Sequence, residues 1–140
     1  MSIEFYVEDV ILPSVDFEII RSVFKSQLRK HKRLLGDINC IFCSDDYLLK
    51  LNIQFLKHNF YTDVITFDYN EERRVSGDIY ISIDRVKDNS VNFGQLYKNE
   101  LVRVVSHGFL HLLSYGDKEQ LEILQMRRME SILVNAYFDF

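Results

Sequence analysis

The stretch His107-Gly-Phe-Leu-His111-Leu-Leu-Ser-Tyr-Gly-Asp117 decides which fold we expect for this chain. His107 and His111 lie four residues apart in a segment, 96–114, predicted to be helical, so their imidazoles share one helical face. Gly116 offers a left-handed position at which the helix can stop and the chain reverse. The Asp117 carboxylate can then swing back beneath both rings. Three ligands that converge from one side leave a divalent metal with an open position, as in catalytic sites.

A buried histidine pair can instead be held by hydrogen bonds alone, so the metal needs further support. Two of the four histidines of the chain lie here, in an otherwise apolar run where an unpartnered polar ring is costly to bury. Gly108 costs a helix about 1 kcal/mol relative to alanine, which indicates that another group approaches the backbone between the rings. With Asp117 included, these features favour a metal site.

Length and composition predict a single domain that spans residues 1–140. The chain is 47% hydrophobic and 14% aromatic, which suits a packed core and excludes a disordered tail. No run approaches the roughly 18 uninterrupted apolar residues that span a bilayer. The acidic N-terminal segment lacks the basic and apolar regions of a signal peptide. We therefore expect a soluble, cytoplasmic protein that does not bind membranes.

Cys40 and Cys43 have the C-x-x-C spacing of redox and zinc motifs. They lie in an apolar run, 38–43, for which we predict a strand. Positions three apart in a strand point to opposite faces, so the pair cannot chelate one metal there. We expect two packed, reduced thiols.

The periodicity of the chain predicts strands interleaved with helices. Strands are expected at 3–7, 38–43, 62–69 and 77–83, and helices at 15–33, 46–57, 84–92, 96–114 and from 117 or 118 onward. The polar loop 70–74 suits an antiparallel hairpin. In the last helix, the residues expected to face inward include Leu121, Leu124, Met126 and Ile132. The order predicts an α+β fold with one mixed sheet of about four strands and about five helices, one a zinc-peptidase-like metal helix.

The chain is acidic overall, but one of its segments is basic. The net charge is −4, yet residues 21–33 carry six Lys or Arg and no acid. Arg21, Lys25 and Arg29 form one stripe at helical spacing. Such a stripe is either a solvated helix face or a contact for a polyanion, and the sequence leaves both open.

The histidine spacing is shared with metal enzymes of other classes. Zinc peptidases of the metzincin type place a glutamate directly after the first histidine as general base, and Gly108 stands there instead. Two histidines and one carboxylate also bind iron in non-haem oxygenases, but those ligands usually lie on β-barrels in another order. Both readings are therefore disfavoured.

The same stretch resembles the signature HGxLHLxGYDH of the YbeY family of bacterial rRNA-maturation endoribonucleases. Leu51-Asn52, 62–67 (TDVITF) and 77–79 (GDI) are similar to its LN, TDVLSF and GDI blocks, in the same order. The last helix, with Met126 and Glu130, continues the likeness, which covers about residues 38–134.

The resemblance implies an α+β domain with one divalent metal, usually zinc, that cleaves single-stranded RNA in small-subunit rRNA maturation and quality control. The implied partners are single-stranded rRNA and the small ribosomal subunit or its assembly factors. His107 and His111 match the first two family ligands, and Asp117 stands where the family has a third histidine. Leu56 replaces an arginine that would suit a phosphate clamp. Ser114 stands where the family has glycine, and Tyr61 where it often has proline.

We therefore predict a metal-dependent, single-strand-specific endoribonuclease with Zn²⁺ held by His107, His111 and Asp117. Candidate substrate-binding residues are Lys57, Thr62, Asp63, Arg21, Lys25 and Arg29. No general base is assigned, and the nucleophile, water or a ribose 2′-hydroxyl, stays open. The alternatives are a non-catalytic ribosome-assembly factor with a structural metal, and a hydrolase of another phosphoester or of an amide.

Overall fold

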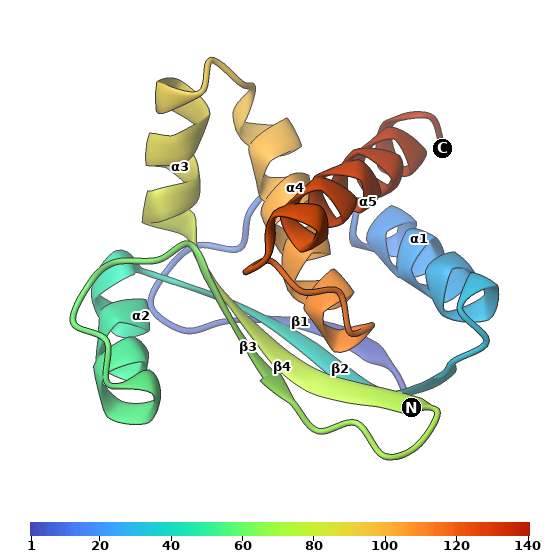
Figure 1. Cartoon of the computed structure of the whole chain (residues 1–140). Coiled ribbons are helices and arrows are strands. Elements are labelled where there is room, and N and C mark those ends of the chain that lie inside the picture. Colours follow the sequence, from blue (N-terminus) through green and yellow to red (C-terminus); the bar gives the residue numbers. More distant parts are fainter.

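Five α-helices pack against one four-stranded mixed sheet in the computed structural model, which describes residues 1–140 (Figure 1). The elements, in order, are β1 (Ile3–Val7), α1 (Phe17–Lys30), β2 (Leu34–Cys43), α2 (Asp45–Leu51), the π-helical turn η1 (Asn52–Leu56), β3 (Val64–Asp68), β4 (Arg74–Ser82), α3 (Ile83–Asn92), α4 (Tyr97–Leu112) and α5 (Gln120–Phe138). The predicted α+β class is confirmed. None of the helices combines the length and apolar composition that crossing a bilayer requires.

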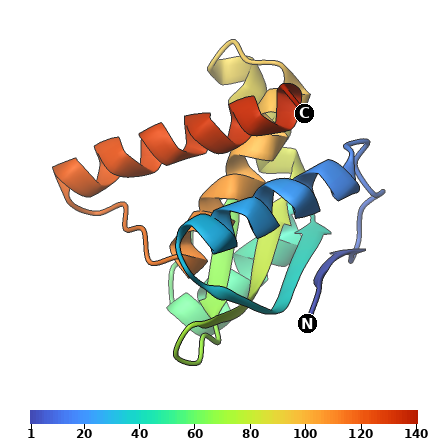
Figure 2. The same ribbon diagram turned by 90° about the vertical axis from the view of Figure 1, so that its right-hand side faces the viewer.

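The sheet has the strand order β1-β2-β4-β3. β1 and β4 both pair with β2 in parallel, whereas β3 pairs with β4 antiparallel, which confirms the predicted hairpin. α1, α4 and α5 lie on the same side of the sheet in both views (Figures 1 and 2). The main apolar core fills the space between these helices and the sheet. A smaller apolar cluster consists of Leu48 of α2, Cys43 and Ile65.

α4 lies at the centre of the core because its backbone approaches the sheet closely at Gly108. A Cβ atom on Gly108 would lie 2.4 Å from Cγ2 of Ile79, so any side chain there would push helix and sheet apart. The group that approaches this glycine is thus the sheet itself. At the next residue of α4, the rings of Phe109 and Phe24 stack with their centroids 4.0 Å apart, which ties α4 to α1.

α4 ends in a Schellman motif whose left-handed residue is Ser114, with a φ of 75°. The amide of Tyr115 donates to the Leu110 carbonyl and the amide of Ser114 donates to the His111 carbonyl, as this motif requires. The prediction that Gly116 reverses the chain is therefore wrong, because a glycine-like conformation is taken two residues earlier. Asp117 still follows the reversal directly.

Two other helices differ from their predicted form. The helix expected at 46–57 ends at Leu51, continues as the π-helical turn η1 and stops at Lys57, whose φ is 57°. In α5 the buried side chains are Met126, Glu130, Leu133 and Tyr137. Met126 faces inward as expected, but Leu121, Leu124 and Ile132 are exposed because they lie off the face defined by this spacing.

The two cysteines are buried free thiols, as predicted. Cys40 belongs to the main core and Cys43 to the smaller cluster, so the two side chains point to opposite faces of β2. Burial raises the pKa of each thiol to about 12.

We expect Ser114→Gly to stabilise the protein, because glycine takes a left-handed conformation without the steric cost that serine bears. The free energy of unfolding should rise by about 0.5–1 kcal/mol and the melting temperature by roughly 2–4 °C. Ser22, exposed on α1, provides the control. Ser22→Gly should lower stability by about 0.5 kcal/mol, since glycine is unfavourable inside a helix. A loss of stability in Ser114→Gly would contradict this description of the turn.

The thiols should not react with a disulfide reagent such as Ellman's reagent in the folded protein at pH 8. Only a thiolate attacks a disulfide. Because the pKa of each buried thiol is raised to about 12, both thiols stay protonated at pH 8. Both should react in guanidinium chloride. Rapid modification of either thiol under native conditions would show that β2 is more accessible than described.

Candidate metal centre

His107, His111 and Asp117 converge on one point at the edge of α4. Nε2 of His107 and Nε2 of His111 lie 2.9 Å apart. Oδ2 of Asp117 lies 3.3 Å from Nε2 of His107 and 3.2 Å from Nε2 of His111. The helix supplies the two rings one turn apart, and the Schellman turn returns Asp117 beneath them. The three side chains predicted from the sequence are thus brought together.

Hydrogen bonds on the far side of each ring determine which nitrogens are free. Nδ1 of His107 lies 2.6 Å from Oε2 of Glu130, and Nδ1 of His111 lies 2.9 Å from the Tyr115 carbonyl oxygen. A carboxylate or carbonyl oxygen only accepts, so each Nδ1 carries the proton and donates. In neutral imidazoles the two Nε2 atoms then present lone pairs to each other and to the Asp117 carboxylate.

A divalent cation fits this donor set. Three lone-pair donors that face one another repel unless a proton or a metal ion lies between them. A tetrahedral ion with ligands at about 2.0–2.1 Å separates neighbouring ligand atoms by roughly 3.3 Å, close to the spacing found here. Histidines that bind metals usually donate their other ring N–H to a carboxylate or a carbonyl, as both do here. His107, His111 and Asp117 could therefore hold a metal ion.

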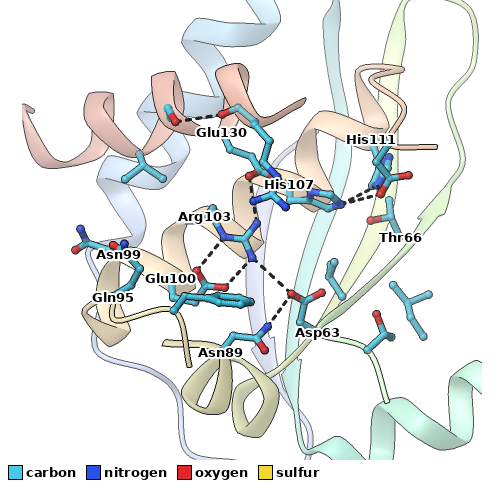
Figure 3. A pocket seen from close by; sticks show the side chains of 18 of the residues that line it. Asp63, Thr66, Asn89, Gln95, Asn99, Glu100, Arg103, His107, His111 and Glu130 are labelled. Atoms are coloured by element: carbon cyan, nitrogen blue, oxygen red, sulfur yellow. Dashed lines mark hydrogen bonds and ion pairs between the residues drawn. The ribbon is translucent and has the colours of Figure 1, made fainter. Parts of the chain in front are cut away.

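His107 contacts a network of charged side chains through Glu130, and the network continues to Arg103 and Glu100 (Figure 3). Arg103, one turn before His107 on α4, donates to both oxygens of Glu100, at 2.9 and 2.7 Å, and to Oε1 of Glu130 at 3.1 Å. Its Nη2 also lies 3.6 Å from Oδ2 of Asp63. Glu100 and Glu130 are only 2% and 3% exposed, so the guanidinium is their main source of compensating charge.

This network holds Glu130 ionised beside His107. Burial acts to raise the pKa of Glu130, but the hydrogen bond with His107 and the charge of Arg103 outweigh it and lower the pKa. Burial likewise acts to lower the pKa of Arg103, and its pairing with Glu100 and Glu130 raises it instead. For Asp63 burial prevails over the charge of Arg103, so its pKa is raised.

The three candidate ligands open into a pocket of about 1120 Å³. Thr62 and Asp63, two predicted substrate-binding residues, line this pocket. Lys57 and the stripe of Arg21, Lys25 and Arg29 do not line it. Arg21 is also engaged elsewhere, because it donates to the Ile3 carbonyl and pairs with Glu4 and Glu18.

A family model described as Endoribonuclease YbeY matches residues 10–137, which include every residue that lines the pocket. The chain belongs to the YbeY endoribonuclease family.

Relatives of known name agree with this assignment. The YbeY endoribonuclease of Parabacteroides distasonis is 42% identical over 84% of this chain and 83% of its own length. That of Cytophaga hutchinsonii is 45% identical over 92% of this chain and 91% of its own length. The solution structure of a Thermotoga maritima protein superposes with a TM-score of 0.67 at 28% identity, covering 98% of this chain and 89% of that one.

The roles of Glu100, Arg103 and Glu130 in this pocket were not predicted from the sequence. One local signal was present: Arg103 lies four residues before His107 and three after Glu100, on one face of α4. Glu130 was noted only as part of the family likeness of the last helix, where it is a charged residue among apolar positions. Its contact with His107 joins positions 23 residues apart and depends on how α5 packs against α4.

We expect Glu130→Gln to weaken the binding of zinc by about 10- to 100-fold, the usual cost of losing such an outer partner. The amide oxygen can still accept from His107, but the amide nitrogen then faces Arg103 and the negative charge is lost. Competition with a chromophoric chelator measures the affinity.

Glu100→Gln is the matched control, because Glu100 pairs with the same arginine but contacts neither histidine. Both variants should lose stability in denaturant, whereas only Glu130→Gln should lose most of its zinc affinity. Equal zinc affinities in the two variants would show that Glu130 acts on the fold alone.

Proposed function

We propose that this protein is a metal-dependent, single-strand-specific endoribonuclease that acts in the maturation and quality control of small-subunit rRNA. His107, His111 and Asp117 hold one divalent ion, Zn²⁺, with a coordination position open to the pocket. The observation that carries the proposal is the pair of Nε2 lone pairs and one carboxylate facing the same point. When bound, the ion supplies Lewis-acid chemistry, which polarises a phosphoryl oxygen and lowers the pKa of water.

The pocket carries more negative than positive side chains, which supports the proposal that it must hold a cation before it can bind RNA. Its lining includes five carboxylates, from Asp63, Asp68, Glu100, Asp117 and Glu130, and three basic side chains, from Arg103, Lys118 and Arg127. Arg103 is already paired with carboxylates, so the apo pocket repels a phosphate. His107, His111 and Asp117 would hold a divalent ion whose two positive charges offset this excess negative charge, so that the loaded pocket would no longer repel a phosphate.

The remaining contacts of the RNA follow from the lining. Lys118 and Arg127 are basic residues of the pocket that can hold flanking phosphates. In this proposal Thr62 and Asp63, which also line the pocket, contact the ribose, whose 2′-hydroxyl distinguishes RNA from DNA. A longer strand that leaves the pocket could reach Lys57, or Lys25 and Arg29 on α1. No general base is assigned to either nucleophile.

The rRNA substrate, the ribosomal partners and a cytoplasmic location belong to the same proposal. They rest on membership of the YbeY family and on the sequence signature shared with it. A ribosome-assembly factor with a purely structural metal would need no open position, whereas three ligands from one side leave one.

Purified zinc-loaded protein should cleave single-stranded rRNA precursor and leave a duplex of the same sequence intact. His111→Ala should reduce cleavage by at least about 10³-fold while circular dichroism shows a retained fold, because the ion is no longer held. Asp117→His, which provides the third histidine usual in the family, should keep both zinc and cleavage. Gel assays of the 5′-labelled RNA report the products.

A contaminating nuclease is excluded if cleavage stops on chelation, returns with zinc and is absent from His111→Ala purified in parallel. Cleavage by His111→Ala at the wild-type rate, or no cleavage by zinc-loaded wild type, would contradict the proposed activity.

A further inference from the structure

We propose that His58 and Phe60 form a base-stacking platform that seats one unpaired nucleobase of the RNA in the pocket that also contains the three candidate metal ligands. This inference rests on the proposed function and names a subsite within it. It comes from the segment 53–61, between α2 and β3 (Figure 1), of which the contacts proposed above use only Lys57.

Every residue of the segment 53–61 is exposed, although five of its nine side chains are large and apolar: Ile53, Phe55, Leu56, Phe60 and Tyr61. Exposed apolar groups that gather in one place usually mark a binding surface. Phe60 is 57% exposed. Both Phe60 and His58 line the same pocket as His107, His111 and Asp117, so this part of the segment opens onto the pocket of the candidate metal ligands.

The platform is held in place by a buried side chain. Asn52 is 1% exposed, and its Nδ2 donates to the Phe60 carbonyl oxygen at 2.9 Å. The His58 amide donates to the Asn52 carbonyl oxygen at 3.1 Å. The left-handed Lys57 turns the chain between them. An exposed loop anchored at both aromatic positions loses little conformational entropy when a ligand binds.

The geometry of the two rings suits a flat ligand. The imidazole of His58 and the ring of Phe60 are stacked, with centroids 5.1 Å apart and planes inclined by 17°. A base can extend this stack over the exposed surface of Phe60. The pocket volume of about 1120 Å³ accommodates a ligand larger than the usual small molecule, as a strand of several nucleotides requires.

A nucleobase is the occupant that best combines with the rest of the pocket. Proteins that bind single strands pair a cationic path for phosphates with aromatic rings on which bases stack. Here Lys118, Arg127 and the metal position provide the first, and His58 and Phe60 the second. A base in a duplex is already stacked and paired, so the platform also favours single-stranded RNA over a duplex.

Phe60→Trp provides a direct probe, because the chain contains no tryptophan. Stopped-flow mixing of the zinc-loaded variant with a short unstructured RNA should quench the fluorescence before cleavage occurs. An RNA of the same length with abasic positions should quench far less at the same bound fraction. Phe140→Trp, at an exposed position outside the pocket, should show no quenching with either RNA.

Substitutions at Phe60 then separate stacking from apolar contact. Phe60→Leu keeps an apolar side chain without an aromatic face, and it should raise KM for single-stranded RNA by roughly 5- to 100-fold, with kcat less affected. Phe60→Tyr should keep the wild-type KM, and Phe140→Ala should change nothing. Circular dichroism and zinc content check that each variant remains folded and loaded.

The outcomes distinguish this inference from the proposed activity. If wild type cleaves RNA, but Phe60→Leu has the wild-type KM and Phe60→Trp is not quenched, the platform is refuted and the nuclease stands. The exposed segment would then be free to contact a protein. If zinc-loaded wild type neither binds nor cleaves RNA, both proposals fail.

Discussion

Two hydrogen bonds, one from Nδ1 of each histidine, are the constraint on which the site depends. They assign the proton of each ring to Nδ1 and leave both Nε2 atoms as donors of lone pairs. One acceptor is the carbonyl of Tyr115, which the end of α4 places there, and the other is Glu130 of α5. The turn after α4 therefore orients His111 and positions Asp117 at the same time.

The fold brings these parts together by close packing around α4. Gly108 lets the helix lie against β4, and the stacked rings of Phe24 and Phe109 hold it against α1. α5 can then deliver Glu130 to His107, while Arg103 compensates the buried carboxylates at Glu100 and Glu130. The result is an acidic pocket whose histidines are preorganised for a cation, so that binding requires little rearrangement.

The features that could be predicted from the sequence are those that depend on local spacing along the chain. Histidines four apart on a helix share a face wherever the helix lies, and a residue that follows a tight reversal returns beneath them, so His107, His111 and Asp117 were identified. The residue that takes the left-handed conformation was not identified correctly. Glycine takes this conformation without strain, so the sequence favoured Gly116, but Ser114, two residues earlier, adopts it. Glu130 and the exposed positions of Leu121, Leu124 and Ile132 depend on the rotation of α5 about its axis, which only packing against α4 decides. The platform at His58 and Phe60 depends on a π-helical turn, and the periodicity there indicates an ordinary helix.

X-ray absorption at the zinc edge of the purified, metal-loaded protein reports the atoms bound to the ion without an activity assay, so it tests whether His107, His111 and Asp117 are the ligands. The proposed ligand set predicts one zinc per chain with nitrogen and oxygen neighbours at about 2.0–2.1 Å and the outer-shell scattering of two imidazoles. A sulfur neighbour at about 2.3 Å, or a shell without imidazole scattering, would contradict it.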